Sequence, residues 1–264
     1  MQLARRRAAR SRRLHSSWVT ALAVIVSSGA STASAGEALV AVATNFADTA
    51  AELADAFTAS TGHGIRIATG ATGKLHAQVV QGAPFDILLA ADGERPARLE
   101  ADGHVVAGQR FTYALGRVCL ISFRDGAADN DPRLVLSAVD VRKIAIANPA
   151  LAPYGAAALE VLRSLGVDDS VRDKIVMGEN VGQAFALVAT GNADLGFVAY
   201  AALVGRGIDS TRTWCAPADM HAPIAQDAVL LKRGADNSAA RAFLEFLQSD
   251  DARAMIEAAG YALP

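Results

Sequence analysis

Four short segments of the chain combine hydroxyl or amide side chains with small residues, each where an apolar run gives way to a helical pattern. The first N–H groups of a helix have no partner within it, and glycine lets a ligand come close to the backbone. Such neutral donors, together with the positive ends of helix dipoles, suit a small, fully deprotonated oxyanion. The segments are Ala43-Thr44-Asn45-Phe46, Gly70 to Leu75 with the sequence GATGKL, Asn148 to Gly155, and Glu179-Asn180-Val181-Gly182-Gln183.

Negative charge is almost absent from these segments. Glu179 is their only carboxylate, and we expect it to cap a helix rather than to face a ligand. A protonated phosphate must donate a hydrogen bond, and a cage of donors offers it no acceptor. Thr44, Asn45 and Thr72 are also common N-cap residues, so capping alone would account for any one of them. Only the four segments taken together predict an anion site.

Other chemistries fit the sequence poorly. Lys74 follows a glycine, but Ala68 stands where a phosphate-binding loop needs its first glycine, and Leu75 where it needs Ser or Thr for magnesium. The chain has no Gly-x-Ser-x-Gly motif, and none of its five histidines falls in a candidate segment. It also has no Cys-x-x-Cys pair to bind a metal. We therefore predict a binding protein that is not an enzyme and needs no cofactor.

The elements that must position these segments alternate between strands and helices. Leu39–Ala43 is an apolar strand run, and Phe46, Ala50, Leu53 and Phe57 follow it at the spacing of one helix face. This alternation continues, and it predicts a βαβαβ unit with parallel pairing. The unit is completed by strands around 65–67 and 86–90, with a short helix carrying Leu75 and Val79 between them.

A second α/β unit of the same kind follows, and a late strand and two closing helices return to the first. Two units with a return segment predict a bilobal α/β protein in which the chain crosses between lobes near residues 115 and 226. The predicted strands are 118–122, 143–147, 175–177, 195–198 and 228–231; helices carry Leu159, Leu162 and Leu165, then Ala184, Leu187 and Val188, and span about 237–248 and 250–259.

Residues 1–35 have the three-part form of a secretory signal. A basic stretch ends at Arg13, an apolar run spans 18–26, and small residues lead to Ala35, after which we expect cleavage. The apolar run is shorter than the ~20 residues that a membrane span needs. General secretion and twin-arginine export both remain open, because an arginine pair such as Arg12-Arg13 occurs in either kind of signal. We expect a soluble periplasmic protein.

The charge balance excludes partners that need a basic surface. The first 35 residues hold six of the 25 Lys and Arg and none of the 27 Asp and Glu, so the rest carries 19 basic against 27 acidic residues. Binding to nucleic acid or an anionic membrane depends on neutralising phosphates. We expect neither partner.

Export bears on the two cysteines, Cys119 and Cys215. An oxidising compartment allows one disulfide that links two strands of one lobe. Two buried thiols are equally consistent with the sequence. Both readings stay open at this point.

In the four polar segments and in several further motifs, the chain resembles the periplasmic molybdate-binding proteins of ABC transporters. The similarity covers nearly all of residues 38–264. The resemblance implies a type II solute-binding fold, with two α/β lobes of mixed sheets joined by a two-strand hinge. Lobe 1 would comprise 36–116 and 226–264, and lobe 2 would comprise 117–225. The motifs that carry the resemblance are Ala43-Thr-Asn-Phe46, Gly73-Lys-Leu75, Gly82-Ala-Pro84 with Asp86, Ala145-Ile-Ala-Asn-Pro149, Ala152-Pro-Tyr-Gly155, Glu179-Asn-Val-Gly-Gln183 and Gln226-Asp-Ala-Val229.

The resemblance also implies a ligand site, which would comprise Thr44, Asn45, Thr72, Tyr154 and the backbone donor of Val181. Thr72 departs from the serine that is usual in the second loop, since it keeps the hydroxyl but adds a methyl group.

Some members of the family instead supply a tyrosine hydroxyl after the Gly-Phe-Val strand. Here that position is Ala199, with Tyr200 one step out of register, so Tyr154 is expected to replace it.

The function implied is the capture of molybdate, with tungstate as a second ligand, and delivery to the permease of an ABC transporter. Molybdenum would be present only as the oxyanion, and the protein is expected to be a monomer. Molybdate and tungstate have nearly the same size and charge, so the preference between them stays open. A receptor for another small anion such as sulfate is the alternative, although smaller sulfate would leave donors underused.

Overall fold

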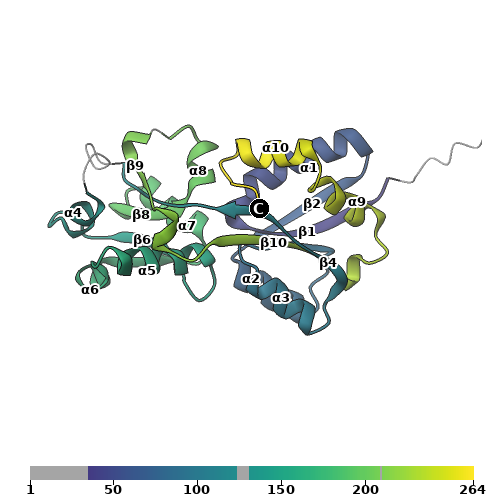
Figure 1. Cartoon of the computed structure of the whole chain (residues 1–264), viewed down its shortest axis with the longest axis horizontal. Coiled ribbons are helices and arrows are strands. Elements are labelled where there is room, and N and C mark those ends of the chain that lie inside the picture. The colour runs from purple at the N-terminus through teal and green to yellow at the C-terminus, as the bar shows by residue number, and fades with distance from the viewer. Residues whose placement is uncertain (1–34, 124–130, 209) are drawn as a thin grey trace, which may run out of the picture. The chain divides into compact units, whose positions relative to one another are not determined.

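A computed structural model describes residues 35–123, 131–208 and 210–264 of the chain (Figure 1). The predicted signal therefore lies outside the described residues, except for Ala35. The described part contains two five-stranded mixed sheets flanked by helices, as the predicted bilobal α/β class requires.

The first sheet has the strand order β2-β1-β3-β10-β4. Strand β1 pairs in parallel with β2 and β3, and β10 runs antiparallel to both β3 and β4. Side chains alternate across β1, so Val40 and Val42 belong to one core cluster and Ala41 to the other. The strands are β1 (Glu37–Ala43), β2 (Gly64–Gly70), β3 (Ile87–Leu89), β4 (Val105–Gly116) and β10 (Ile224–Leu231).

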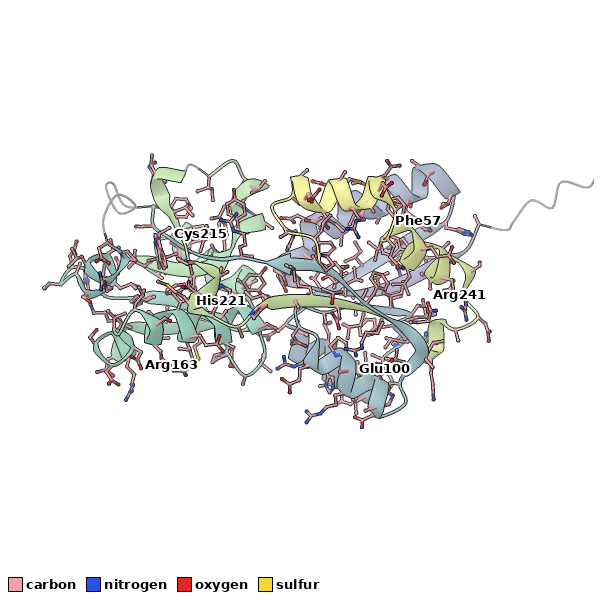
Figure 2. The ribbon with its side chains drawn as sticks, viewed as in Figure 1. Phe57, Glu100, Arg163, Cys215, His221 and Arg241 are labelled. Carbon is pink, nitrogen blue, oxygen red and sulfur yellow. A yellow bond between two sulfur atoms is a disulfide. The ribbon has the colours of Figure 1, made fainter. Side chains whose placement is uncertain are left out.

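Helices cover both faces of this sheet. On one face Phe57 packs edge-on against Phe243, with ring centroids 5.2 Å apart, and joins α1 to α9 (Figure 2). On the other face Leu75 and Leu99 bring α2 and α3 against the strands. The helices are α1 (Ala47–Thr61), α9 (Ser238–Phe246) and α10 (Asp250–Ala258) on the first face, and α2 (Thr72–Val80) and α3 (Glu94–Ala101) on the second.

The second sheet has the order β7-β6-β8-β5-β9. Its strands are β5 (Val118–Ile121), β6 (Ile144–Ala147), β7 (Ile175–Gly178), β8 (Leu195–Ala199) and β9 (Thr213–Cys215). One core cluster takes residues from α4 (Pro132–Ser137), α5 (Pro153–Ser164) and α6 (Asp168–Val171), and another from α7 (Val181–Ala189) and α8 (Tyr200–Val204). Short 3-10 helices lie at η1 (Thr44–Phe46), η2 (Arg172–Lys174), η3 (Ser210–Arg212), η4 (Ala218–Met220) and η5 (Lys232–Gly234).

Two strands lie where the chain passes between the sheets. Strand β4 ends at Gly116 in the first sheet and β5 begins at Val118 in the second, while β10 starts at Ile224 opposite Gly116 (Figure 1). Asp227 ties β10 to β4, because its carboxylate accepts hydrogen bonds from Thr112 Oγ1 at 2.7 Å and Arg110 Nη1 at 3.1 Å. Strands β4 and β10 are therefore hydrogen-bonded to each other next to the point where the chain crosses between the sheets.

The predicted elements are present, with shifted ends. The strand expected at 228–231 is four residues longer at its start, and the helix expected at 237–248 spans Ser238–Phe246. Helices α3, α4, α6 and α8 and strands β4 and β9 were not predicted. None of the helices in the described ranges is long and apolar enough to cross a bilayer.

The structure decides between the two readings of the cysteines. Cys119 of β5 and Cys215 of β9 lie directly opposite each other in the sheet and form a disulfide across a sequence separation of 96 (Figure 2). The bridge thus holds the short edge strand β9 to its neighbour β5.

We expect the double substitution Cys119→Ala with Cys215→Ala to lower the free energy of unfolding by about 2–4 kcal/mol, because the bridge closes a long loop in the unfolded chain. Urea unfolding of the oxidised wild type, the reduced wild type and the variant measures the effect. Reduced wild type and variant should agree, and an unchanged midpoint in both would contradict this role of the bridge.

Candidate functional site

A small cavity lies where helix starts from the two sheets meet. All five residues of the predicted site line it: Thr44, Asn45, Thr72, Tyr154 and Val181. The remaining lining residues are small or apolar apart from one amide: Ala43, Gly70, Ala71, Ala91, Ala152, Pro153 and Asn180. No charged side chain lines this cavity.

Thr44 and Asn45 sit in η1, directly after β1. Thr44 Oγ1 is buried and has no hydrogen-bond partner among the described residues. The Asn45 side chain is already committed, since its Nδ2 donates to Gln226 Oε1 at 2.7 Å and lies 3.3 Å from the Tyr261 hydroxyl. What Asn45 can offer a ligand is therefore its backbone N–H, not its amide side chain.

Thr72 begins α2 and is buried, with 1% of its surface exposed. Its Oγ1 accepts a hydrogen bond from the N–H of Ala91 at 3.1 Å. Because the oxygen is used as an acceptor, the hydroxyl proton is left to be donated. The hydroxyl is thus oriented by the protein itself.

Tyr154 lies in the first turn of α5, after Pro153, which has no N–H to lose at a helix start. A Cβ on Gly155 would lie 2.1 Å from the Ala147 carbonyl oxygen, so glycine here lets α5 start against the end of β6. The Tyr154 hydroxyl is buried without a hydrogen-bond partner in the described part of the chain. Burial, and then the nearby Tyr261, raise the pKa of Tyr154 well above its usual range, so the hydroxyl stays protonated as a donor.

Val181 is the first residue of α7, and its side chain is buried. Asn180 caps this helix, since its Oδ1 accepts from the N–H of Gln183 at 3.0 Å. The cap leaves the first N–H groups, including that of Val181, to point out of the helix toward the cavity. The neighbouring Gly182 is not among the five predicted ligand residues, yet a Cβ on it would lie 2.6 Å from Thr44 Cγ2.

Direct bonds link the segments around the rim of the cavity. The N–H of Gly73 donates to the Leu151 carbonyl at 2.8 Å, and Arg95 Nη2 donates to the Ala150 carbonyl at 2.9 Å. Lys74 Nζ lies 3.1 Å and 3.3 Å from the two carboxylate oxygens of Glu179. These bonds hold α2 and α3 against the loops that precede α5 and α7.

The capping role expected of Glu179 is wrong. Asn180 caps α7, and the Glu179 carboxylate instead pairs with Lys74, which neutralises the one negative charge of the four segments. Tyr200 does not line the cavity, and its ring lies under the Arg117 guanidinium at 4.4 Å. Within the described ranges no cluster of His, Cys, Asp or Glu could hold a metal ion.

The sequence profile described as bacterial extracellular solute-binding protein matches residues 38–262. The chain belongs to this family. Such proteins are binding receptors and not enzymes, in agreement with the prediction from the sequence.

Two curated relatives of this solute-binding protein are named molybdate-binding protein ModA. The protein from Rhodobacter capsulatus is 44% identical over 92% of this chain and 94% of its own. The protein from Azotobacter vinelandii is 44% identical over 88% and 92%.

Solved structures agree with the sequence comparison. The periplasmic molybdate-binding protein of Azotobacter vinelandii superposes with a TM-score of 0.82 at 40% identity, covering 86% of this chain and 99% of that one. A substrate-binding domain of a putative molybdenum ABC transporter from Clostridium difficile superposes with a TM-score of 0.65 at 26% identity, covering 87% and 100%. The bilobal fold predicted from the sequence is thereby confirmed.

The unpaired hydroxyl of Thr44 leads to a prediction about stability. Burying a polar atom without a partner costs free energy. We therefore expect Thr44→Val to leave the free energy of unfolding of the ligand-free protein unchanged or to raise it by up to about 1 kcal/mol. Thr72→Val is the matched control: it removes the acceptor of the Ala91 N–H and should lower the value by about 1 kcal/mol. Urea unfolding distinguishes them, and equal losses would contradict the assignment.

Proposed function

We propose that this protein captures molybdate in the cavity between its two sheets and delivers it to the permease of an ABC transporter. The observation that carries the proposal is the lining itself: neutral donors from four helix starts face one cavity that no charged side chain lines. Two of its hydroxyls, on Thr44 and Tyr154, are buried without partners in the described structure, so both are available to bond to a ligand. The names of the two curated relatives identify molybdate as the ligand to test first.

The chemistry of the lining favours a dianion that carries no proton. The Thr72 oxygen accepts from the N–H of Ala91, so its proton is left to be donated toward the cavity. A ligand hydroxyl, such as that of hydrogen phosphate, would find no carboxylate acceptor in the lining. Sulfate is smaller than molybdate, so we expect it to leave some of these donors underused. Tungstate shares the size and charge of molybdate, and we propose it as a second ligand.

The remaining parts of the proposal concern organisation. Lobe 1 would comprise residues 36–116 and 226–264 and lobe 2 residues 117–225, with closure of the lobes ordering both halves of the site, as in other hinged receptors. The chain would be exported to the periplasm with its signal cleaved after Ala35 and would act as a monomer. The five ligand residues would be Thr44, Asn45, Thr72, Tyr154 and Val181.

Titration calorimetry of the mature protein with molybdate, tungstate, sulfate and phosphate tests this function. We expect sub-micromolar Kd values for molybdate and tungstate and far weaker binding of sulfate and phosphate. Thermal unfolding with each anion provides a second reading, since a ligand that binds only the folded form raises Tm. Equal affinity for sulfate would make the protein a general sulfate-type receptor and would overturn the proposed specificity.

A second prediction concerns the contact between Gly182 and Thr44. The extra methyl of Gly182→Ala would lie 2.6 Å from Thr44 Cγ2, so α7 could not approach η1 as closely. We expect molybdate affinity to fall at least about tenfold, which corresponds to one lost charge-assisted hydrogen bond.

The matched control is Gly205→Ala, at the end of α8, where the new methyl meets only the Ala201 carbonyl oxygen at 3.5 Å. Its Kd should equal that of the wild type. If both alanine variants bind molybdate like the wild type, the close approach of α7 is not needed for binding.

A further inference from the structure

Gln226 on β10 is fully buried, and its surroundings fix how its amide is oriented. Its Oε1 accepts from Asn45 Nδ2 at 2.7 Å, and the Tyr113 hydroxyl lies 3.3 Å from the same oxygen. The Asn45 amide nitrogen is a donor, so the Gln226 oxygen faces it, whereas the single Tyr113 proton is shared with the Ala90 carbonyl oxygen at 3.1 Å. The NH2 end of the Gln226 side chain is therefore directed away from Asn45 and Tyr113.

At that end, Gln226 Nε2 has no hydrogen-bond partner among the residues that the structure describes. The Tyr154 hydroxyl is in the same situation, and both atoms lie against Gly116. A Cβ on Gly116 would lie 2.3 Å from the Tyr154 hydroxyl and 3.1 Å from Gln226 Nε2. Because Gly116 has no side chain, both groups have room beside it.

The two unpaired groups are chemically complementary. An amide N–H can only donate, whereas a tyrosine oxygen can accept while its proton is donated elsewhere. The Gln226 amide opposes the rise in the pKa of Tyr154 that burial causes, yet no bond of normal geometry joins the two groups.

We propose that Gln226 is a positioning residue for Tyr154: its Nε2 donates to the tyrosine oxygen when an anion fills the cavity, so that the hydroxyl proton points at the ligand. This inference rests on the proposed anion-binding function. The bond from Gln226 would make the Tyr154 hydroxyl a donor toward the ligand, because an oxygen already accepting from Gln226 is a poorer acceptor for a proton on the ligand. It also links Asn45 of η1 to Tyr154 of α5 through one side chain.

A double-mutant cycle tests the inference. Gln226→Met keeps the length of the side chain but removes its N–H, and Tyr154→Phe removes the hydroxyl on which it is proposed to act. We expect each single variant to weaken molybdate binding about tenfold, the size of one hydrogen bond to a charged ligand. The double variant should bind no more weakly than Tyr154→Phe alone, because the two changes remove one interaction. Losses that multiply would show that Gln226 acts elsewhere, for example through Asn45, and would overturn the inference.

A control separates positioning from general weakening of the crossing strands. Thr112→Val removes a hydrogen bond to Asp227 in the same strand pair, so it should lower Tm while leaving the molybdate Kd unchanged. A Thr112→Val protein that loses affinity like Gln226→Met would mean that any damage to this pair has the same effect, which would contradict a specific role for Gln226.

The inference can also fail separately from the proposed function. If wild-type protein binds none of the four anions, the proposed function is wrong. If the wild type does bind molybdate, the link between Gln226 and Tyr154 is read from the ¹³Cζ resonance of Tyr154 in molybdate-saturated, tyrosine-labelled protein, assigned with Tyr154→Phe. Gln226→Met should shift this resonance, and Thr112→Val should not. An unchanged resonance in molybdate-saturated Gln226→Met would overturn the positioning role and leave the proposed function intact.

Discussion

The proposed function depends on one constraint: an anion taken out of water must receive hydrogen bonds without receiving a counter-charge. The proposed site would meet it with helix starts from two separate sheets, which surround one cavity. The buried Thr44 and Tyr154 hydroxyls, which have no partner among the described residues, would supply two of those bonds. The rim bonds, such as that between Gly73 and Leu151, then bring the two halves close enough for donors from both to reach one ion.

Much of this could be predicted from the sequence, because the elements near the site are strongly patterned. The strand run Leu39–Ala43 and the helix stripe through Phe57 are buried and apolar, and each strand that ends beside the cavity is followed by a polar turn. Parallel pairing of β1 with β2 and β3 then brings the ends of those strands together. The residues that line the cavity follow from that topology together with the motif resemblance.

Other features could not be predicted, for identifiable reasons. Strand β4 is half-exposed, carries Gly108 in the left-handed region at φ 72°, and pairs with β10 through register shifts, so no alternating pattern marks it. The partner of Glu179 is Lys74, more than a hundred residues away, and local spacing predicted only a helix cap. The contact between Gly182 and Thr44 likewise depends on how the two halves meet.

The disulfide between Cys119 and Cys215 has one more consequence. Strand β9 is three residues long and lies at the edge of the second sheet. An open edge exposes backbone donors and acceptors to which another chain can add a strand. A covalent bond to the neighbouring β5 keeps this short strand in place, so the inner strand it covers is shielded from association with other molecules. The bridge thereby protects the protein against aggregation through this sheet.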